Sequence, residues 1–91
     1  MDRPTLETLI LSLASAAWVQ LGRVPGEPGD STLVNLTMAR HSIEMLAMLS
    51  DKTEGNRTAA ESELLRRLLH DLRMAWVEEQ RTQADDDEPS R

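Results

Sequence analysis

Apolar side chains recur at spacings of three and four along most of the chain, which is the period of one face of an α-helix. The first run predicts a helix over residues 5–22, with Thr5 as its N-cap and Gly22 as the residue that closes its carboxyl end. Further apolar residues lie off its main stripe, so this helix is apolar on most of its sides. The expected inward stripe consists of Leu6, Leu9, Ile10, Leu13, Ala14, Ala17 and Leu21.

The segment "GRVPGEPGD" at residues 22–30 interrupts the helical pattern. Its two prolines lack a backbone donor and its three glycines permit positive φ, so we assign a loop to residues 23–30. A second helix is predicted over residues 31–53, with Asp30 or Ser31 as its N-cap. Its expected inward stripe consists of Leu36, Ala39, Ile43, Leu46 and Leu49.

A third helix is predicted over residues 58–80. Its outer face carries Glu63, Arg67 and Asp71, four apart and of alternating sign, as is typical of a solvent-exposed helix surface. Beyond it, residues 81–91 have almost no apolar content, so we expect a disordered acidic tail. The expected inward stripe of this helix consists of Leu65, Leu68, Leu72, Ala75 and Trp76.

These patterns predict an all-α fold, a three-helix antiparallel hairpin or bundle. A chain of 91 residues encloses one small core and is too short for two separate domains. We therefore assign a single helical domain to residues 1–80 and the tail to residues 81–91.

The segment "DKTEGNRTAAE" at residues 51–61 groups a Lys, a Thr, a Gly and an Asn, as a phosphate-binding loop does. A phosphate loop also needs a glycine-rich run before its lysine, which is missing here. The lysine instead complements the carbonyl end of a helix, the glycine and asparagine tolerate left-handed backbone, and "TAAE" fits a capping box. We therefore predict a helix end, a tight turn at residues 54–57 and a helix start. The residues assigned to this structural role are Lys52, Gly55, Asn56, Thr58 and Glu61.

The formal net charge of −6 and the lack of cysteine narrow the classes of function. A protein that neutralises nucleic-acid phosphates carries a basic face, so nucleic acid is not an expected partner. Without cysteine, disulfides, thiolate nucleophiles and cysteine-based zinc sites are excluded. The uncharged span Thr8–Gly22 is too short to cross a bilayer and follows acidic residues, unlike a signal peptide. We expect a cytoplasmic protein with no membrane partner.

Candidate chemistry is sparse. His41 and Glu44 share a helix face at a spacing used by helical metal ligands, but one such pair does not make a site. General acid/base catalysis needs a positioned carboxylate or histidine in a pocket, and the carboxylates here fall on exposed faces, beside bases or in the tail. We therefore expect no enzymatic activity, no cofactor, and no catalytic, cofactor-binding or metal-binding residues. An alternative is a small-molecule or metal site between helices that uses Arg40, His41 and Arg73.

The first two helices offer more apolar surface than three short helices enclose, and such surplus surface marks a contact with another chain. Methionine is also a common filler of irregular core gaps. A symmetric dimer is the commonest way to bury a surplus patch. The resulting hypothesis is a non-enzymatic helical protein that acts as a homodimer or by binding another protein. The candidate interface residues are Leu11, Trp18, Val19, Met38, Met45 and Met48.

Three segments resemble a bacterial family of small proteins known only as a domain of unknown function, DUF1844. They are "LILSLASAAWVQLG" (9–22), "NLTMARHSIEMLAMLSDKTEGNRTAAE" (35–61) and "LLRRLLHDLRMAWVE" (64–78), and the run "ARHSIEMLAMLSDKTEGN" is the specific part. Trp18 and His70 depart from the family's pattern, and the acidic tail is peculiar to this chain. The resemblance implies a helical fold and transfers no catalytic residues.

Overall fold

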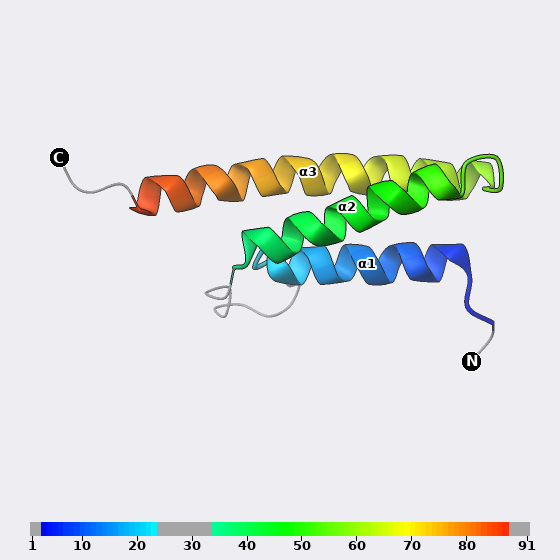
Figure 1. Ribbon diagram of the computed structural model, residues 1–91, viewed down its shortest axis with the longest axis horizontal. Coiled ribbons are helices and arrows are strands. Elements are labelled where there is room, and N and C mark those ends of the chain that lie inside the picture. Colours follow the sequence, from blue (N-terminus) through cyan, green and yellow to red (C-terminus); the bar gives the residue numbers. More distant parts are fainter. Residues whose placement is uncertain (1–2, 24–33, 88–91) are drawn as a thin grey trace.

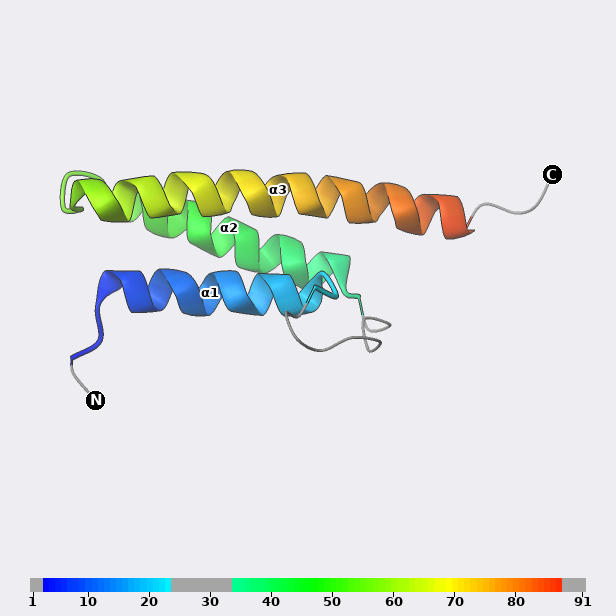
Figure 2. The same cartoon turned by 180° about the vertical axis from the view of Figure 1, so that it is seen from behind.

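The computed structural model describes residues 3–23 and 34–87, which form three α-helices and no strand (Figure 1). Consecutive helices run in opposite directions, and α2 packs against both α1 and α3, as the front and rear views show (Figures 1 and 2). The predicted all-α, three-helix fold is confirmed. The helices are α1 (Leu6–Gln20), α2 (Leu36–Lys52) and α3 (Ala59–Asp87).

The hydrophobic core lies where the three helices meet and is built from one stripe of each. The predicted stripes are correct in nearly every position, because burial follows the helical period. Leu9 is the exception, since its side chain is 46% exposed at the edge of the α1 stripe, and Leu69 is a buried residue that the stripes omitted. The core consists of Ile10, Ala14, Ala17, Leu21, Ala39, Ile43, Leu46, Leu65, Leu69, Leu72 and Ala75.

Both ends of α1 are closed as the sequence indicated. Thr5 is the N-cap, and its hydroxyl oxygen accepts from the Thr8 backbone amide at 3.1 Å. At the other end Gly22 has a φ of 77°. The Gly22 amide donates to the Val19 carbonyl oxygen at 2.9 Å, and the Arg23 amide donates to the Trp18 carbonyl oxygen at 2.8 Å. This pair of bonds is a Schellman motif, which requires the left-handed residue that glycine supplies.

The start of α2 differs from the prediction. The helix begins at Leu36, and its N-cap is Asn35, whose side-chain oxygen accepts from the Met38 amide at 3.0 Å. Asparagine caps a helix as well as aspartate or serine does. The residue type alone therefore could not show whether Asp30, Ser31 or Asn35 is the N-cap. Asp30, Ser31 and the part of the predicted loop beyond Arg23 lie outside the described residues.

The third helix continues past the predicted end at residue 80 to Asp87. The segment predicted as a tail therefore overlaps α3 in residues 81–87, and residues 88–91 lie outside the described part. The prediction considered only the lack of apolar content, but extending an existing helix needs no new nucleus and adds one hydrogen bond per residue. As a result α3 is about 43 Å long and α2 about 26 Å, so one end of α3 projects beyond the bundle (Figure 1).

Candidate functional site

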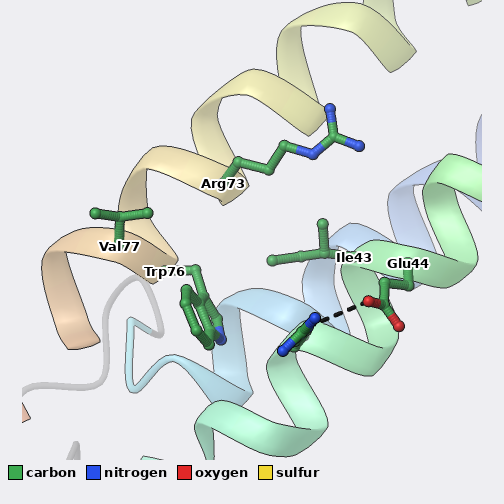
Figure 3. Close-up of a pocket in the computed structure, with 6 residues that line it drawn as sticks. Ile43, Glu44, Arg73, Trp76 and Val77 are labelled. Carbon is green, nitrogen blue, oxygen red and sulfur yellow. Dashed lines mark hydrogen bonds and ion pairs between the residues drawn. The ribbon is translucent and has the colours of Figure 1, made fainter.

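A cleft of about 430 Å³ lies between α2 and α3 (Figure 3). Ile43 and Trp76 lie between the two helices and form its apolar part, together with Val77. The polar part comes from side chains on both helices. The lining residues are Arg40, Ile43, Glu44, Arg73, Trp76 and Val77.

Trp76 fixes the geometry of this cleft. Its indole N–H donates to the carbonyl oxygen of Leu36 at 2.8 Å, which ties the first turn of α2 to the second half of α3. The ring is partly buried and packs against the core. The wall of the cleft is therefore held by a specific hydrogen bond as well as by apolar contact.

The charges in the cleft are unbalanced. Arg40 Nε donates to Glu44 Oε2 at 3.2 Å, one turn further along α2. Arg73, on α3, has no carboxylate within 4.0 Å among the described residues. The cleft thus combines two guanidinium groups, one carboxylate and an apolar wall. Guanidinium groups favour carboxylate or phosphate partners.

Two of the three residues proposed as a polar ligand site meet in this cleft. Arg40 and Arg73 both line it, although they lie on different helices and far apart in sequence. His41 is exposed on α2 and does not line the cleft. It follows Arg40 directly, so its side chain points about 100° away around the helix. In residues 3–23 and 34–87, no group of three or more His, Cys, Asp or Glu side chains is placed to hold a metal ion.

The candidate interface residues do not form one surface. Leu11, Val19, Met38 and Met48 are 45–54% exposed, whereas Trp18 and Met45 are partly buried. Gln20 marks the side of α1 that contacts α2. At about 100° per residue, Leu11 and Trp18 lie roughly 160–180° around α1 from Gln20. They are therefore on the opposite side of α1 from the methionines of α2.

An apolar surface runs along the seam between α1 and α2. Of the two orientations of the Gln20 amide, the one that satisfies its hydrogen bonds places the nitrogen 3.0 Å from the Met38 carbonyl oxygen and 3.3 Å from the Ala16 carbonyl oxygen, so these residues are neighbours. Leu9 precedes Ala16 by seven residues and Met45 follows Met38 by seven, which is about two helical turns. Because α1 and α2 are antiparallel, both lie further along the same seam. We call Leu9, Ala16, Met38 and Met45 the α1–α2 face.

The turn between α2 and α3 has the capping box that the sequence predicted. The Thr58 amide donates to Glu61 Oε1 at 2.8 Å, and the Glu61 amide donates to Thr58 Oγ1 at 3.1 Å. Gly55 has a φ of 87° as expected, but α2 ends with Thr53 as its C-cap, so Gly55 is the second residue beyond the cap. Lys52 is in the last turn of α2.

Asn56 does not adopt a positive φ. Its amide donates to the Thr53 carbonyl oxygen at 2.9 Å, which closes a turn over residues 53–56. Glycine at the third position of such a turn takes the left-handed conformation, so the asparagine does not need to. The segment at residues 51–61 is thus built as a helix end, a turn and a helix start.

A second hollow, of about 360 Å³, lies near the start of α3 and contains several carboxylates. Glu61 is engaged in the capping box. Glu63 forms an ion pair with Arg66, and this hydrogen bond lowers the pKa of the Glu63 carboxyl and raises the pKa of Arg66. These two carboxylates therefore have local structural partners.

The comparison with protein families decides the assignment of the chain. The family model described as "Domain of unknown function (DUF1844)" matches residues 3–78. The chain belongs to the DUF1844 family. Neither a curated protein nor a solved structure matches it. The match covers α1, α2, the cleft and the capping box, and it ends before the projecting part of α3.

No helix in the described part of this DUF1844 protein combines the length and the hydropathy that crossing a membrane requires. The described helices all carry charged residues, and α1, the most apolar, has only 15 residues. About 20 predominantly apolar residues are needed to span a bilayer.

Sequence reasoning missed two polar clusters in this DUF1844 protein. Ser42 is buried, and its hydroxyl oxygen lies 2.8 Å from the Gln20 side-chain amide. Arg57 donates to the Ser50 carbonyl oxygen and, at 3.2 Å, to Thr53 Oγ1, so it bonds to the carboxyl end of α2. Ser42 could have been recognised from the sequence, because it is a polar residue at a position where the helical period predicts burial. The sequence contains no comparable signal for Arg57, because its contacts depend on the path of the turn.

Proposed function

We propose that this DUF1844 protein is a bacterial, cytoplasmic, non-enzymatic protein that acts through self-association or by binding another protein. The observation that carries this proposal is the exposure of large apolar side chains on α1 and α2. Leu9, Leu11, Val19, Met38 and Met48 are 45–54% exposed. Among these five, Leu9 and Met38 share the α1–α2 face, and an apolar patch of this kind on a protein surface is typical of interaction sites.

The α1–α2 face is the part of this surface that suits a two-fold contact. It combines side chains from two antiparallel helices. A two-fold axis through this seam would place the patch of one copy against the same patch of the other copy. Leu9 and Met38 are its two most exposed members, at 46% and 45%. Methionine adapts its shape to a partner surface, because its unbranched side chain has three rotatable bonds.

Sedimentation equilibrium of the purified protein tests this proposal. The monomer has a mass of 10.2 kDa, and we expect a dimer at micromolar concentration. Met38→Glu places a charge on the α1–α2 face and should weaken the dimer at least tenfold. Met74→Glu is the matched control, since Met74 is 59% exposed on α3, away from this face. Equal weakening by both variants, or a monomeric wild type, would contradict the proposed self-association.

A second candidate function is the binding of a small anionic molecule in the cleft between α2 and α3. The juxtaposition of Arg40 and Arg73 beside Trp76 supports it. A thermal-shift screen with nucleotides, metals and acidic metabolites tests it, with Arg73→Gln as the comparison. A flat response of the wild-type protein, or equal shifts in both proteins, would count against this function.

A further inference from the structure

The cleft between α2 and α3 has positive charge without a matching partner. Arg73 has no carboxylate within 4.0 Å among the described residues, and Arg40 shares the single carboxylate of Glu44. The Arg40 and Glu44 side chains are 68% and 63% exposed, so both remain accessible to an incoming group. An anionic group that enters this cleft would meet two guanidinium groups above an apolar wall.

The chain itself carries a matching anionic segment at the far end of α3. Residues 78–91 include six acidic and two basic side chains, whereas residues 64–77 include three arginines and one aspartate. Four of those acids are consecutive, from Asp85 to Glu88. α3 ends at Asp87 and its last turn contains no basic residue, so Asp85, Asp86 and Asp87 lie at the helix end where the macrodipole disfavours acidic residues.

This acidic end is not covered by the other helices. In Figures 1 and 2 the end of α3 projects past the start of α2 and past the end of α1. It also lies outside residues 3–78, the range that matches the DUF1844 family. The fold that the family model describes therefore does not account for this acidic end.

The acidic end cannot reach the cleft of its own molecule. From Arg73 to Asp87 the backbone is continuously helical, which places the two residues about 21 Å apart along α3. Residues 85–87, which are part of α3, can therefore meet this cleft on another copy of the chain but not on their own.

We propose that the cleft between α2 and α3 binds the acidic end of α3, residues 85–87, of a second copy of this chain. The proposal rests on the proposed self-association and adds a second two-fold contact to the one on the α1–α2 face, so that copies using both contacts assemble beyond a dimer. In this contact the α3 helices of two copies run antiparallel, and the two-fold axis that relates them passes beside residues 79–80. Each acidic end then lies opposite Arg73 of the other copy. The contact is then made twice. It is separate from the α1–α2 face, because the cleft lies on the other flank of α2.

A charge-swap experiment tests this contact on the full chain. The cleft variant is Arg40→Glu/Arg73→Glu, and the end variant is Asp85→Lys/Asp86→Lys/Asp87→Lys. Arg40 and Arg73 lie outside the core, and circular dichroism checks that each variant keeps its helicity. The control is Arg3→Glu/Arg67→Glu, which changes the net charge as the cleft variant does but alters no residue of the cleft.

Sedimentation velocity should show each variant alone associating at least tenfold more weakly than wild type. A 1:1 mixture of the cleft and end variants should restore association, because each then offers the charge that the other lacks. The control should behave as wild type. Raising the salt from about 0.05 M to about 1 M should weaken the wild-type contact, since the Debye length falls to roughly 3 Å.

The possible outcomes distinguish failure of this contact from failure of the proposed self-association. If the wild type associates and neither the cleft nor the end variant changes that association, this contact is refuted while self-association stands. If both variants weaken association but their mixture does not restore it, the two segments bind different partners and the inference is also wrong. A wild type that remains monomeric at both salt concentrations overturns the proposed self-association as well.

Discussion

Gly55 offers a clean test of the turn between α2 and α3, because backbone conformation and steric contact can be separated there. Its φ is 87°, in the left-handed region that L side chains resist. A Cβ atom added at this position has no heavy atom within 4 Å. The cost of a substitution should therefore come from the backbone alone.

The expected size of that cost follows from the left-handed conformation. A side chain with a Cβ pays roughly 1–2 kcal/mol there, and a β-branched residue is the least tolerant. Gly55→Val should lower the free energy of unfolding by about this amount. For a domain of this size, 1 kcal/mol corresponds to a decrease in Tm of roughly 4–8 °C.

Urea denaturation followed by circular dichroism measures the effect, and Gly55→Asn is the matched control. Asparagine adopts positive φ more readily than valine, so the order of stability should be wild type, then Gly55→Asn, then Gly55→Val. If valine left stability within a few tenths of a kcal/mol of wild type, the left-handed turn would be the wrong description. Equal large losses for asparagine and valine would indicate a steric clash that the structure does not contain.

Three further predictions concern single contacts. Thr58→Ala removes the N-cap of α3 and should cost about 1 kcal/mol in a urea titration, whereas Thr58→Ser should restore most of it. Trp76→Phe keeps a ring but loses the indole bond to the Leu36 carbonyl oxygen, and should cost about 1 kcal/mol by the same measurement. Arg66→Ala should raise the pKa of the Glu63 carboxyl towards its ordinary value in an NMR titration, because the bond that lowers it is removed. Since that pKa is depressed in the folded chain, its small stabilising contribution is present above the unfolded pKa and is lost as pH falls through the folded pKa.

The features that sequence reasoning predicted correctly are those set by neighbours in the chain. The Thr5 cap, the left-handed Gly22 and the Thr58 capping box each involve contacts within a few residues. The helical stripes succeeded because the helical period, a local property, gathers the apolar side chains on the face that packs against the other helices.

Features that depend on how two helices meet could not be predicted in this way. The cleft requires Arg40 on α2 and Arg73 on α3 to line the same hollow. The sequence proposed these two residues together with His41, which points elsewhere on α2. The ion pair between Arg23 and Glu78, at 3.0 Å, joins residues that only the packing of α1 against α3 brings together. The predicted end of α3 at residue 80 was wrong for another reason. Extension of a helix depends on the turn that precedes it more than on the burial of side chains.

The most direct test of the proposed function is the solution mass of the wild-type chain at micromolar concentration. Sedimentation equilibrium at low and at high salt measures it without an assumed shape. The account predicts a mass of at least twice 10.2 kDa at low salt, and weakening of this association by Met38→Glu but not by Met74→Glu. A mass of 10.2 kDa at every concentration and salt would contradict it, and the exposed side chains of α1 and α2 would then require a different partner.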